Sequence, residues 1–373
     1  MSLLDRQLPE PAFVSRDAEA ITREMIAQYE SLTGKTLYPA QVERILIDII
    51  AYRESLTRQA IQDAGKLNLV RFSRAPVLDY LGENVGVPRL GAIAATTTLR
   101  FTFNPVPAAA TILPAGTTVE IGDVAFATDA DVLVAAGAAS VDAAATCTVP
   151  GVIGNGFVAG QIQTLASVLP SLSVANVANT TTSADGAEAE DDEYYRERIV
   201  LAPEQWSNAG SVGAYRFWAR SAHPDVIDVA VVSPTPGVVN IHPLTKSGLP
   251  SQGIKDRVYA KCSADTVRPL TDEVHVLDPV LFDYQIVARI TRFKDADSTL
   301  TLTTAQTAAQ NWRDAGLKKL GGDIVRTQIN RALHGYGVYS LDLQQPAADQ
   351  VIGPQGWSRC TAIDVSISGI ADE

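Results

Sequence analysis

The sequence predicts an α+β multidomain protein with an N-terminal helical region, a β-rich middle domain and two small C-terminal α+β domains. Its 373 residues exceed one typical core and suit about two to four compact domains. The hydrophobic pattern changes near residue 91 from helical spacing to the alternation of strands, and both patterns recur after residue 182. We therefore divide the chain into residues 1–90, 91–182, 183–280 and 281–373.

The first region is predicted to contain two long helices after an irregular, proline-containing arm. One helix should begin at Ser15 as its N-cap and end at Gly34. The second should start near Pro39 and run to about Ala64, with Gly65 ending it. The apolar stripe of the first helix consists of Ile21, Met25, Tyr29 and Leu32.

The second helix carries an apolar stripe wider than one narrow seam. Leu46 and Ile50 widen a row of residues at steps of three and four. The helix can pack on the core of its own domain, but the first 65 residues contain few other apolar elements to cover so wide a face. An intermolecular helix bundle is the alternative. Its candidate interface residues are Val42, Ile45, Ile49, Tyr52 and Leu56.

The second region has the period-two alternation of short strands. Leu99, Phe101 and Phe103 alternate with Thr or Arg, and glycine- and proline-containing turns separate this segment from similar ones around Val119 and Phe126. The expected β-domain is rich in Ala, Thr and Val and poor in aromatic residues. This composition argues against a sugar-stacking groove or a base-stacking platform.

The third region opens with acidic residues at 188–193, followed by Arg196 and Arg198. Acids at a helix start and bases further in suit the helix dipole, so a helix is predicted there. Further helices are expected at Val212–Ala222, Ser251–Cys262, 300–316 and 322–334. Strands are expected at Val226–Val232, Val274–Val276, Tyr284–Thr291, 337–343 and 361–368.

Signals for enzyme chemistry are scattered. The net charge of −12 disfavours a broad nucleic-acid surface. Cys147, Cys262 and Cys360 lie too far apart for a C-x-x-C motif, and the four histidines include no pair with metal-ligand spacing. We expect no catalytic residues, no metal ligands and no cofactor. No apolar run could cross a bilayer and no signal peptide is evident, so we expect synthesis and assembly in a cytoplasm without membrane insertion.

Several blocks, taken in their order, resemble the baseplate J family of contractile-tail bacteriophages, including its Mu-like and P2-like versions. The blocks are residues 74–89, 113–117 with 126–128, 151–160, 185–188, 192–199, 210–219, 226–229 and 269–272. Asp192-Glu193-Tyr194-Tyr195-Arg196-Glu197-Arg198-Ile199 is part of the most specific of them. Ala187 stands where a further glycine is expected, a departure that affects only local turn geometry.

The resemblance implies a baseplate wedge protein, present as paired copies with a smaller partner in each wedge, with six wedges forming a ring around a central hub. Its N-terminal helices would enter a shared bundle. Its C-terminal α+β domains would pair between neighbouring copies and open when the sheath contracts. Implied partners are other copies of this chain, the smaller wedge protein, and sheath-initiator and hub proteins. The implied location is the virion tail baseplate, assembled in the bacterial host cytoplasm.

Movement of this kind requires hinges, for which glycines before and after the β-rich region are the candidates. They are Gly82, Gly86, Gly91 and Gly186. A tail-associated carbohydrate-binding protein or a hydrolase is the alternative function. The first would predict aromatic-rich β repeats, and the second would predict convergent titratable residues in a cleft.

Overall fold

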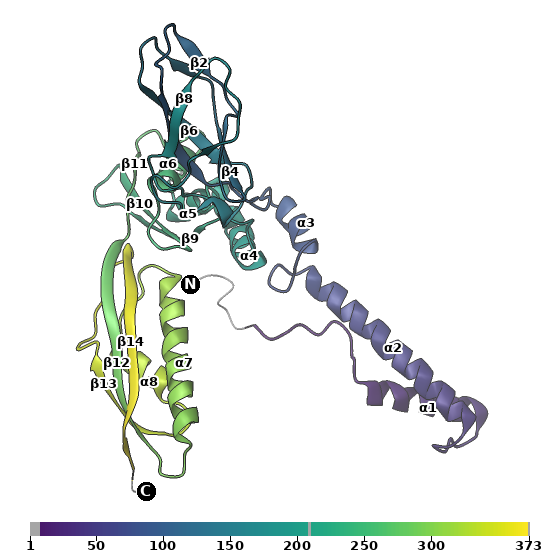
Figure 1. The fold of residues 1–373 in the computed structure, drawn as a ribbon. Coiled ribbons are helices and arrows are strands. Elements are labelled where there is room, and N and C mark those ends of the chain that lie inside the picture. Colours follow the sequence, from purple (N-terminus) through teal and green to yellow (C-terminus); the bar gives the residue numbers. More distant parts are fainter. Residues whose placement is uncertain (1–7, 208–209, 372–373) are drawn as a thin grey trace. The chain divides into compact units, whose positions relative to one another are not determined.

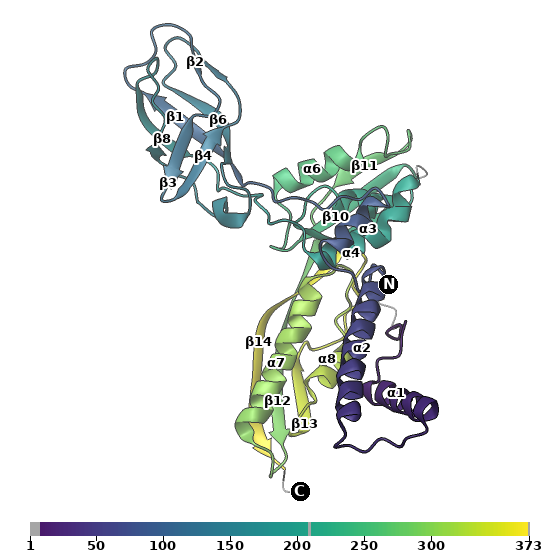
Figure 2. The same ribbon diagram turned by 90° about the vertical axis from the view of Figure 1, so that its right-hand side faces the viewer.

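The computed structural model describes residues 8–207 and 210–371, which group into two compact units (Figures 1 and 2). The first unit contains the chain up to Arg89 together with Asp191–Pro203, and the second contains Leu90–Glu190 and the chain from Glu204 onward. Helices at the N-terminus, a β-rich middle region and C-terminal α+β elements confirm the predicted fold class. Residues 191–203, which the sequence assigns to the third region, group with the N-terminal helices.

The first unit contains α1 (Ala18–Thr33), α2 (Val42–Leu67), α3 (Val77–Glu83) and α4 (Asp192–Leu201). Gly34 ends helix α1, as predicted, and it is the C-cap with a left-handed φ of 68°. Its N-cap is Asp17, so the prediction of Ser15 was wrong. The Asp17 carboxylate accepts hydrogen bonds from the N–H groups of Glu19 and Ala20, which a serine two residues earlier cannot reach. Within the predicted apolar stripe of this helix, Ile21 is buried, whereas Leu32 is 79% exposed.

Helix α2 begins at Val42 and continues through Gly65 to Leu67, so both of its predicted ends were displaced. Gly65 lies inside the helix and does not end it. A Cβ at Gly65 would stand 2.7 Å from Cδ2 of Phe13, so the missing side chain makes room for the N-terminal arm. Here glycine serves close packing and not a left-handed turn.

The β-rich part of the second unit is built around a six-stranded antiparallel sheet in the order β7-β3-β4-β6-β1-β8, and β2 pairs with β5 beside it (Figure 1). Leu99, Phe101 and Phe126 are fully buried in its core, as the alternation predicts. The strands are β1 (Thr96–Phe103), β2 (Thr111–Leu113), β3 (Thr118–Ile121), β4 (Val124–Thr128), β5 (Val132–Val134), β6 (Ser140–Cys147), β7 (Thr164–Leu165) and β8 (Val174–Asn179). A short 3₁₀ helix, η2 (Val152–Gly154), follows β6, and another, η3 (Ala202–Trp206), lies outside the β-rich part, directly after α4.

The next part is a three-stranded sheet in the order β11-β10-β9, with two helices against it. Tyr215, Ile241 and Val258 are buried where the helices meet the sheet. The elements are α5 (Val212–Arg220), β9 (Val226–Val232), β10 (Val238–Thr245), α6 (Gln252–Cys262) and β11 (Glu273–Val276). The predicted strand Val226–Val232 agrees with β9.

The C-terminal part has the sheet order β13-β12-β14, with β13 antiparallel and β14 parallel to the central strand. Ile286 and Ile290 of β12 are fully buried in the core that the two helices help to form. Two cross-strand ion pairs, Asp283–Arg359 and Arg289–Asp364, are exposed. The elements are β12 (Val280–Arg292), α7 (Ser298–Leu317), α8 (Arg326–Leu333), β13 (Val338–Gln345) and β14 (Gly356–Ile370). Helix α8 starts later than predicted because Ile324 forms a β-bridge with Gln350.

Candidate assembly interface

One face of α2 packs against the rest of its own unit. Ile47 and Ala51 are buried, and Gln62 is fully buried three turns further along the same side. The Gln62 side chain donates a hydrogen bond to the carbonyl of Pro11 and accepts one from the N–H of Phe13. The N-terminal arm and α1 therefore occupy this side of the helix (Figure 1).

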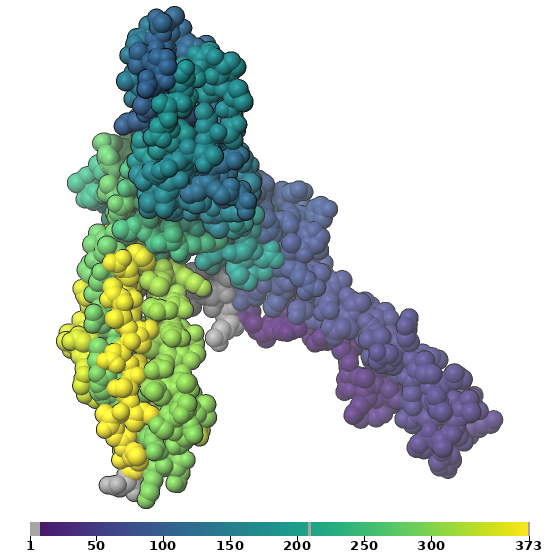
Figure 3. Space-filling view, viewed as in Figure 1, coloured from purple at the N-terminus to yellow at the C-terminus, as the bar shows by residue number. Residues whose placement is uncertain are grey.

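The predicted interface residues lie on the opposite side of α2, and all five are exposed. Their exposed fractions are 69% for Val42, 52% for Ile45, 54% for Ile49, 62% for Tyr52 and 45% for Leu56. Leu46 and Ile50 extend the same surface and are also more than half exposed. The surface that faces away from α1 and the arm is open in the space-filling view (Figure 3). We call the five residues together with Leu46 and Ile50 the α2 stripe.

A contiguous apolar surface on a helix costs free energy when water covers it, and in soluble proteins such surfaces mark interaction sites. Burying one Val, Leu or Ile side chain contributes roughly 1.5–3 kcal/mol. The α2 stripe is therefore well suited to a partner helix. Its width suits contact with more than one neighbouring helix.

A second feature of the same unit was missed by the sequence reasoning. The Tyr195 ring of α4 is fully buried and its hydroxyl donates a hydrogen bond of 2.8 Å to the carbonyl of Val87. Gly82 of α3 lies beneath this hydroxyl, where any Cβ would overlap it. The Arg89 guanidinium stacks 4.5 Å from the centre of the Tyr195 ring. The motif at residues 192–199 thus packs on the segment that contains Gly82 to Arg89.

Arg89 also makes two short ion pairs, each at 2.7 Å, with Asp79 and Asp192. Burial by itself would raise the pKa of Asp192, but hydrogen bonds from Arg89 and from the N–H of Ala75, with the nearby positive charges, lower it below its ordinary value. For Arg89, burial opposes its charge, and the two carboxylates overcome this and raise its pKa. The charged forms of both partners are therefore favoured.

Two further arginines of α4 are buried and bond to backbone carbonyl groups. Arg196 donates to the carbonyls of Val70 and Ser73, at 2.8 and 2.7 Å, and Arg198 donates to that of Pro88 at 2.7 Å. The sequence favoured a helix-dipole role for the charges at this helix start. The Asp191 carboxylate caps α4, which agrees with the role predicted for the acidic residues. The arginines additionally hold residues 70–88 in place.

The four candidate hinge glycines have different environments. Gly82 is packed under Tyr195, and Gly186 is enclosed by Gly151 and Asn155, so neither has free space around it. Gly86 has a left-handed φ of 71°, and neither Gly86 nor Gly91 has a neighbouring atom within 4 Å of a would-be Cβ. Gly91 lies two residues beyond Arg89, where the first compact unit ends.

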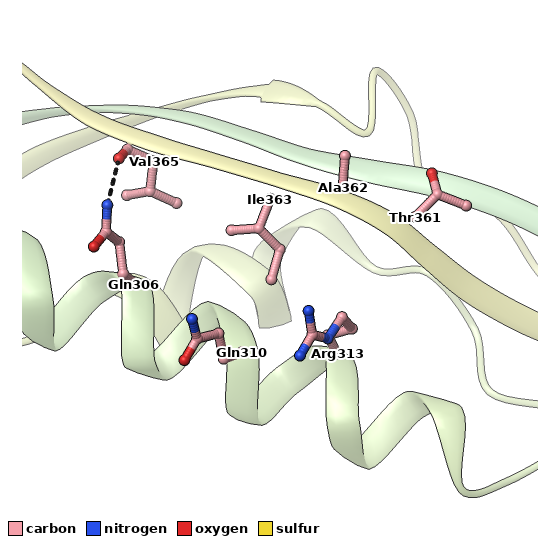
Figure 4. A pocket seen from close by; sticks show the side chains of 7 residues that line it. All are labelled: Gln306, Gln310, Arg313, Thr361, Ala362, Ile363 and Val365. Carbon is pink, nitrogen blue, oxygen red and sulfur yellow. Dashed lines mark hydrogen bonds between the residues drawn. The ribbon is translucent and has the colours of Figure 1, made fainter. Parts of the chain in front are cut away.

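Side chains that could bind a metal do not gather at one place within residues 8–207 and 210–371. No cluster of three or more His, Cys, Asp or Glu side chains with metal-site geometry is found in this part of the chain. The three cysteines are free and buried, and burial raises the pKa of Cys262 to about 12, which keeps it a thiol. A groove of about 520 Å³ between α7 and β14 is lined by Gln306, Gln310 and Arg313 together with residues 361–363 and 365 of β14 (Figure 4). None of the helices in the described ranges is both long and apolar enough for a transmembrane span.

Three family models match consecutive parts of this chain. They are the Baseplate J-like protein barrel domain at residues 98–186, the Baseplate J-like central domain at residues 207–278 and the Baseplate J-like protein C-terminal domain at residues 284–366. These matches fall on the β-rich part and on the two α+β parts that follow it.

Among individual proteins, baseplate protein J of Escherichia phage P2 is 34% identical over 204 residues, which are 54% of this chain and 67% of the phage protein. A chain in the cryo-EM structure of the anti-feeding prophage baseplate aligns with 93% of this chain and 90% of its own length, at 13% identity and a TM-score of 0.42. The three matched domains in sequence order, together with the identity to the phage protein, show that this chain belongs to the baseplate J family.

Proposed function

We propose that this chain is a wedge subunit of the baseplate of a contractile phage-type tail, and that it joins the wedge through the α2 stripe. As a member of the baseplate J family, it is a structural baseplate protein of the virion tail. Its partners in the wedge are another copy of this chain and a smaller wedge protein. The observation that carries the proposal is the α2 stripe itself, since seven large side chains on the side of α2 away from α1 and the arm are exposed.

The finer architecture follows from the same proposal. Six wedges surround the central hub, the C-terminal α+β domains pair between neighbouring copies, and sheath-initiator and hub proteins contact the ring. A ring of repeated contacts needs interfaces that close by rotation, and a switch needs contacts that can re-form in a second geometry. Gly86 and Gly91 have the space for a change in backbone angles, whereas the packing at Gly82 and Gly186 favours a fixed conformation. The particle is assembled in the bacterial host cytoplasm.

The bundle interface is tested by replacing Ile45 and Ile49 together by serine. Both side chains are about half exposed, so the isolated chain should keep its melting temperature. If each buries against a partner helix, the affinity for the co-expressed smaller wedge protein should fall by at least about a hundredfold. Mass photometry of the purified mixture measures this as loss of the complex.

Leu270→Ser is the matched control, because Leu270 is 95% exposed and lies far along the sequence from α2. It removes a similar apolar side chain and should leave the complex intact. A chain that stays monomeric with the smaller protein and with fractions from cells making the particle would contradict the proposal. If the double variant forms the complex as well as the wild-type chain does, this would refute the α2 stripe as the interface and leave the rest of the proposal standing.

The hinge part of the proposal is tested in assembled particles. Gly91→Pro restricts backbone rotation next to the end of the first unit, while Gly122→Ala alters a turn between β3 and β4 inside the β-rich part. Electron microscopy after induced contraction should show a smaller fraction of contracted tails for Gly91→Pro than for Gly122→Ala. The number of assembled particles should be the same for both variants. The same fraction in both variants would exclude a hinge at Gly91.

A further inference from the structure

Asp185 has an unusual backbone conformation. Its φ of 69° is the only left-handed value at a non-glycine position in residues 8–207 and 210–371. Aspartate tolerates a left-handed φ better than most residues do. Even so, this conformation persists only where the surrounding structure holds it. Asp185 follows β8 and lies in the loop that leads back toward α4, next to the candidate hinge Gly186.

The side chain of Asp185 is held at the start of α6. Ser251, the N-cap of α6, donates a hydrogen bond from its hydroxyl to the Asp185 carboxylate. Gly253 lies in the first turn of the same helix, and a Cβ there would overlap the carboxylate. The N-terminus of a helix favours a negative charge because its free N–H groups carry positive partial charge. The Asp185 carboxylate therefore occupies the space left by Gly253 and accepts the hydrogen bond of Ser251 at the start of α6.

The backbone of Asp185 is held by His223, which is fully buried between α5 and β9. The His223 Nδ1 accepts a hydrogen bond of 3.2 Å from the N–H of Asp225, so the proton is on Nε2. Nε2 then donates to the carbonyl oxygen of Asp185, 3.1 Å away. The ring is fixed in one tautomer, and it anchors the peptide group that follows the strained φ.

The next residue is bonded from the β-rich part. The Asn155 side chain accepts from the N–H of Gly186 at 2.9 Å and donates to its carbonyl at 2.8 Å. Ala184 and Ala187 on either side pair with the backbone of Thr96 and Ile93. The loop around Asp185 therefore connects the β1 side of the β-rich part with α6 and with the loop before β9.

We propose that Asp185 is a strained latch: its carboxylate, bound by Ser251 at the N-terminus of α6, holds residues 184–187 in a fixed joint between the β-rich part and the central α+β part. Loss of that contact detaches the loop from α6, so that the bonds to His223 and Asn155 and the backbone pairs with Thr96 and Ile93 hold it alone and it opens more often. This inference does not depend on the α2 stripe or on wedge assembly.

The test is hydrogen exchange of the full chain, read by mass spectrometry in residues 184–187 and, as an internal reference, in the core strand β1. Asp185→Gly keeps the left-handed φ without strain but removes the carboxylate. Exchange in the loop should become about tenfold faster while β1 is unchanged. Asp185→Asn keeps an oxygen acceptor for Ser251 and should exchange nearly as slowly as the wild-type protein. Loop exchange in Asp185→Gly that is equal to or slower than wild type would overturn the latch.

Ser251→Ala tests the same contact from the other side. It should accelerate loop exchange to a similar extent, and adding Asp185→Gly should increase it no further, because both substitutions remove one contact. Ser247→Ala is the matched control. Asp185, Ser251 and Ser247 all line one cavity of about 300 Å³, but Ser247 bonds to Thr245 and Asp225. Additive effects of the two substitutions, or an equal effect of the control, would show that Asp185 and Ser251 do not act together.

Discussion

The guanidinium of Arg196 in α4 donates a hydrogen bond of 2.7 Å to the backbone carbonyl of Ser73, a residue 123 positions earlier in the chain. A second bond from the same group reaches Val70. Both acceptors follow the C-terminal end of α2, the helix that carries the α2 stripe. One side chain of α4 thereby fixes the end of the proposed assembly helix within the first unit.

Replacement of Arg196 should therefore destabilise the first unit. Arg196→Met leaves two carbonyl acceptors without their charged donor, and we expect a loss of about 2–4 kcal/mol in the free energy of unfolding, measured by urea denaturation. Arg196→Lys should recover only part, because an ammonium cannot reproduce the two-armed geometry. Arg23→Lys on the exposed surface of α1 is the control and should have almost no effect. An Arg196→Met variant of wild-type stability would contradict this role.

Gly82 and Tyr195 should show coupled effects. A Cβ at position 82 would overlap the Tyr195 hydroxyl and stand 2.6 Å from the Val87 carbonyl oxygen, so Gly82→Ala should cost about 1–3 kcal/mol. Tyr195→Phe removes the hydroxyl and its bond to Val87, at a cost of about 1 kcal/mol. The double variant should lose less than the sum of the two single losses, since the overlap with the hydroxyl disappears. Strictly additive losses would show that the two side chains do not interact.

The exposed ion pairs of the C-terminal sheet should affect the titration of their acids. Hydrogen bonding to Arg359 holds the pKa of Asp283 below its ordinary value, and Arg289 does the same for Asp364. An acid with a lowered pKa in the folded state stabilises the fold above its unfolded pKa, and this contribution disappears as the pH falls through the folded pKa. Carbon-detected NMR titration should show that Arg359→Gln moves the pKa of Asp283 upward and leaves that of Asp364 unchanged. High salt should weaken both shifts.

His223 should impose a separate pH dependence at milder acidity. Burial lowers the pKa of its imidazole in the folded protein, although the Asp185 carbonyl, Asp225 and the Asp185 charge oppose this and Arg257 adds to it. The unfolded chain then binds the proton more readily, so stability is constant above about pH 6.5 and falls as the pH drops below that value. In His223→Gln, the difference in urea midpoint between pH 7.5 and pH 5.5 should be smaller. An unchanged difference would show that His223 does not account for it.

Local periodicity was sufficient for much of the fold. The alternation of Leu99, Phe101 and Phe103 predicted a strand whose large side chains point into one core, and these residues are buried in β1. Helical spacing likewise placed Ile45, Ile49 and Leu56 on one side of α2. Such patterns report which residues share a face, because successive positions in a helix or strand have fixed directions. Helix ends were less predictable, as Asp17 and Gly65 show, since capping and close packing depend on individual contacts.

The sequence by itself determined the fold class, many of the helices and strands and the apolar row along α2, because these follow from the period of apolar residues along the chain. Only the tertiary structure decided that the α2 stripe faces away from α1, that Arg196 and Tyr195 join α4 to residues 70–88, and that Asp185 is held at α6. These relationships pair buried donors with acceptors far apart in sequence. Burial requires that each polar group find a partner, and only the folded chain determines which partner is within reach.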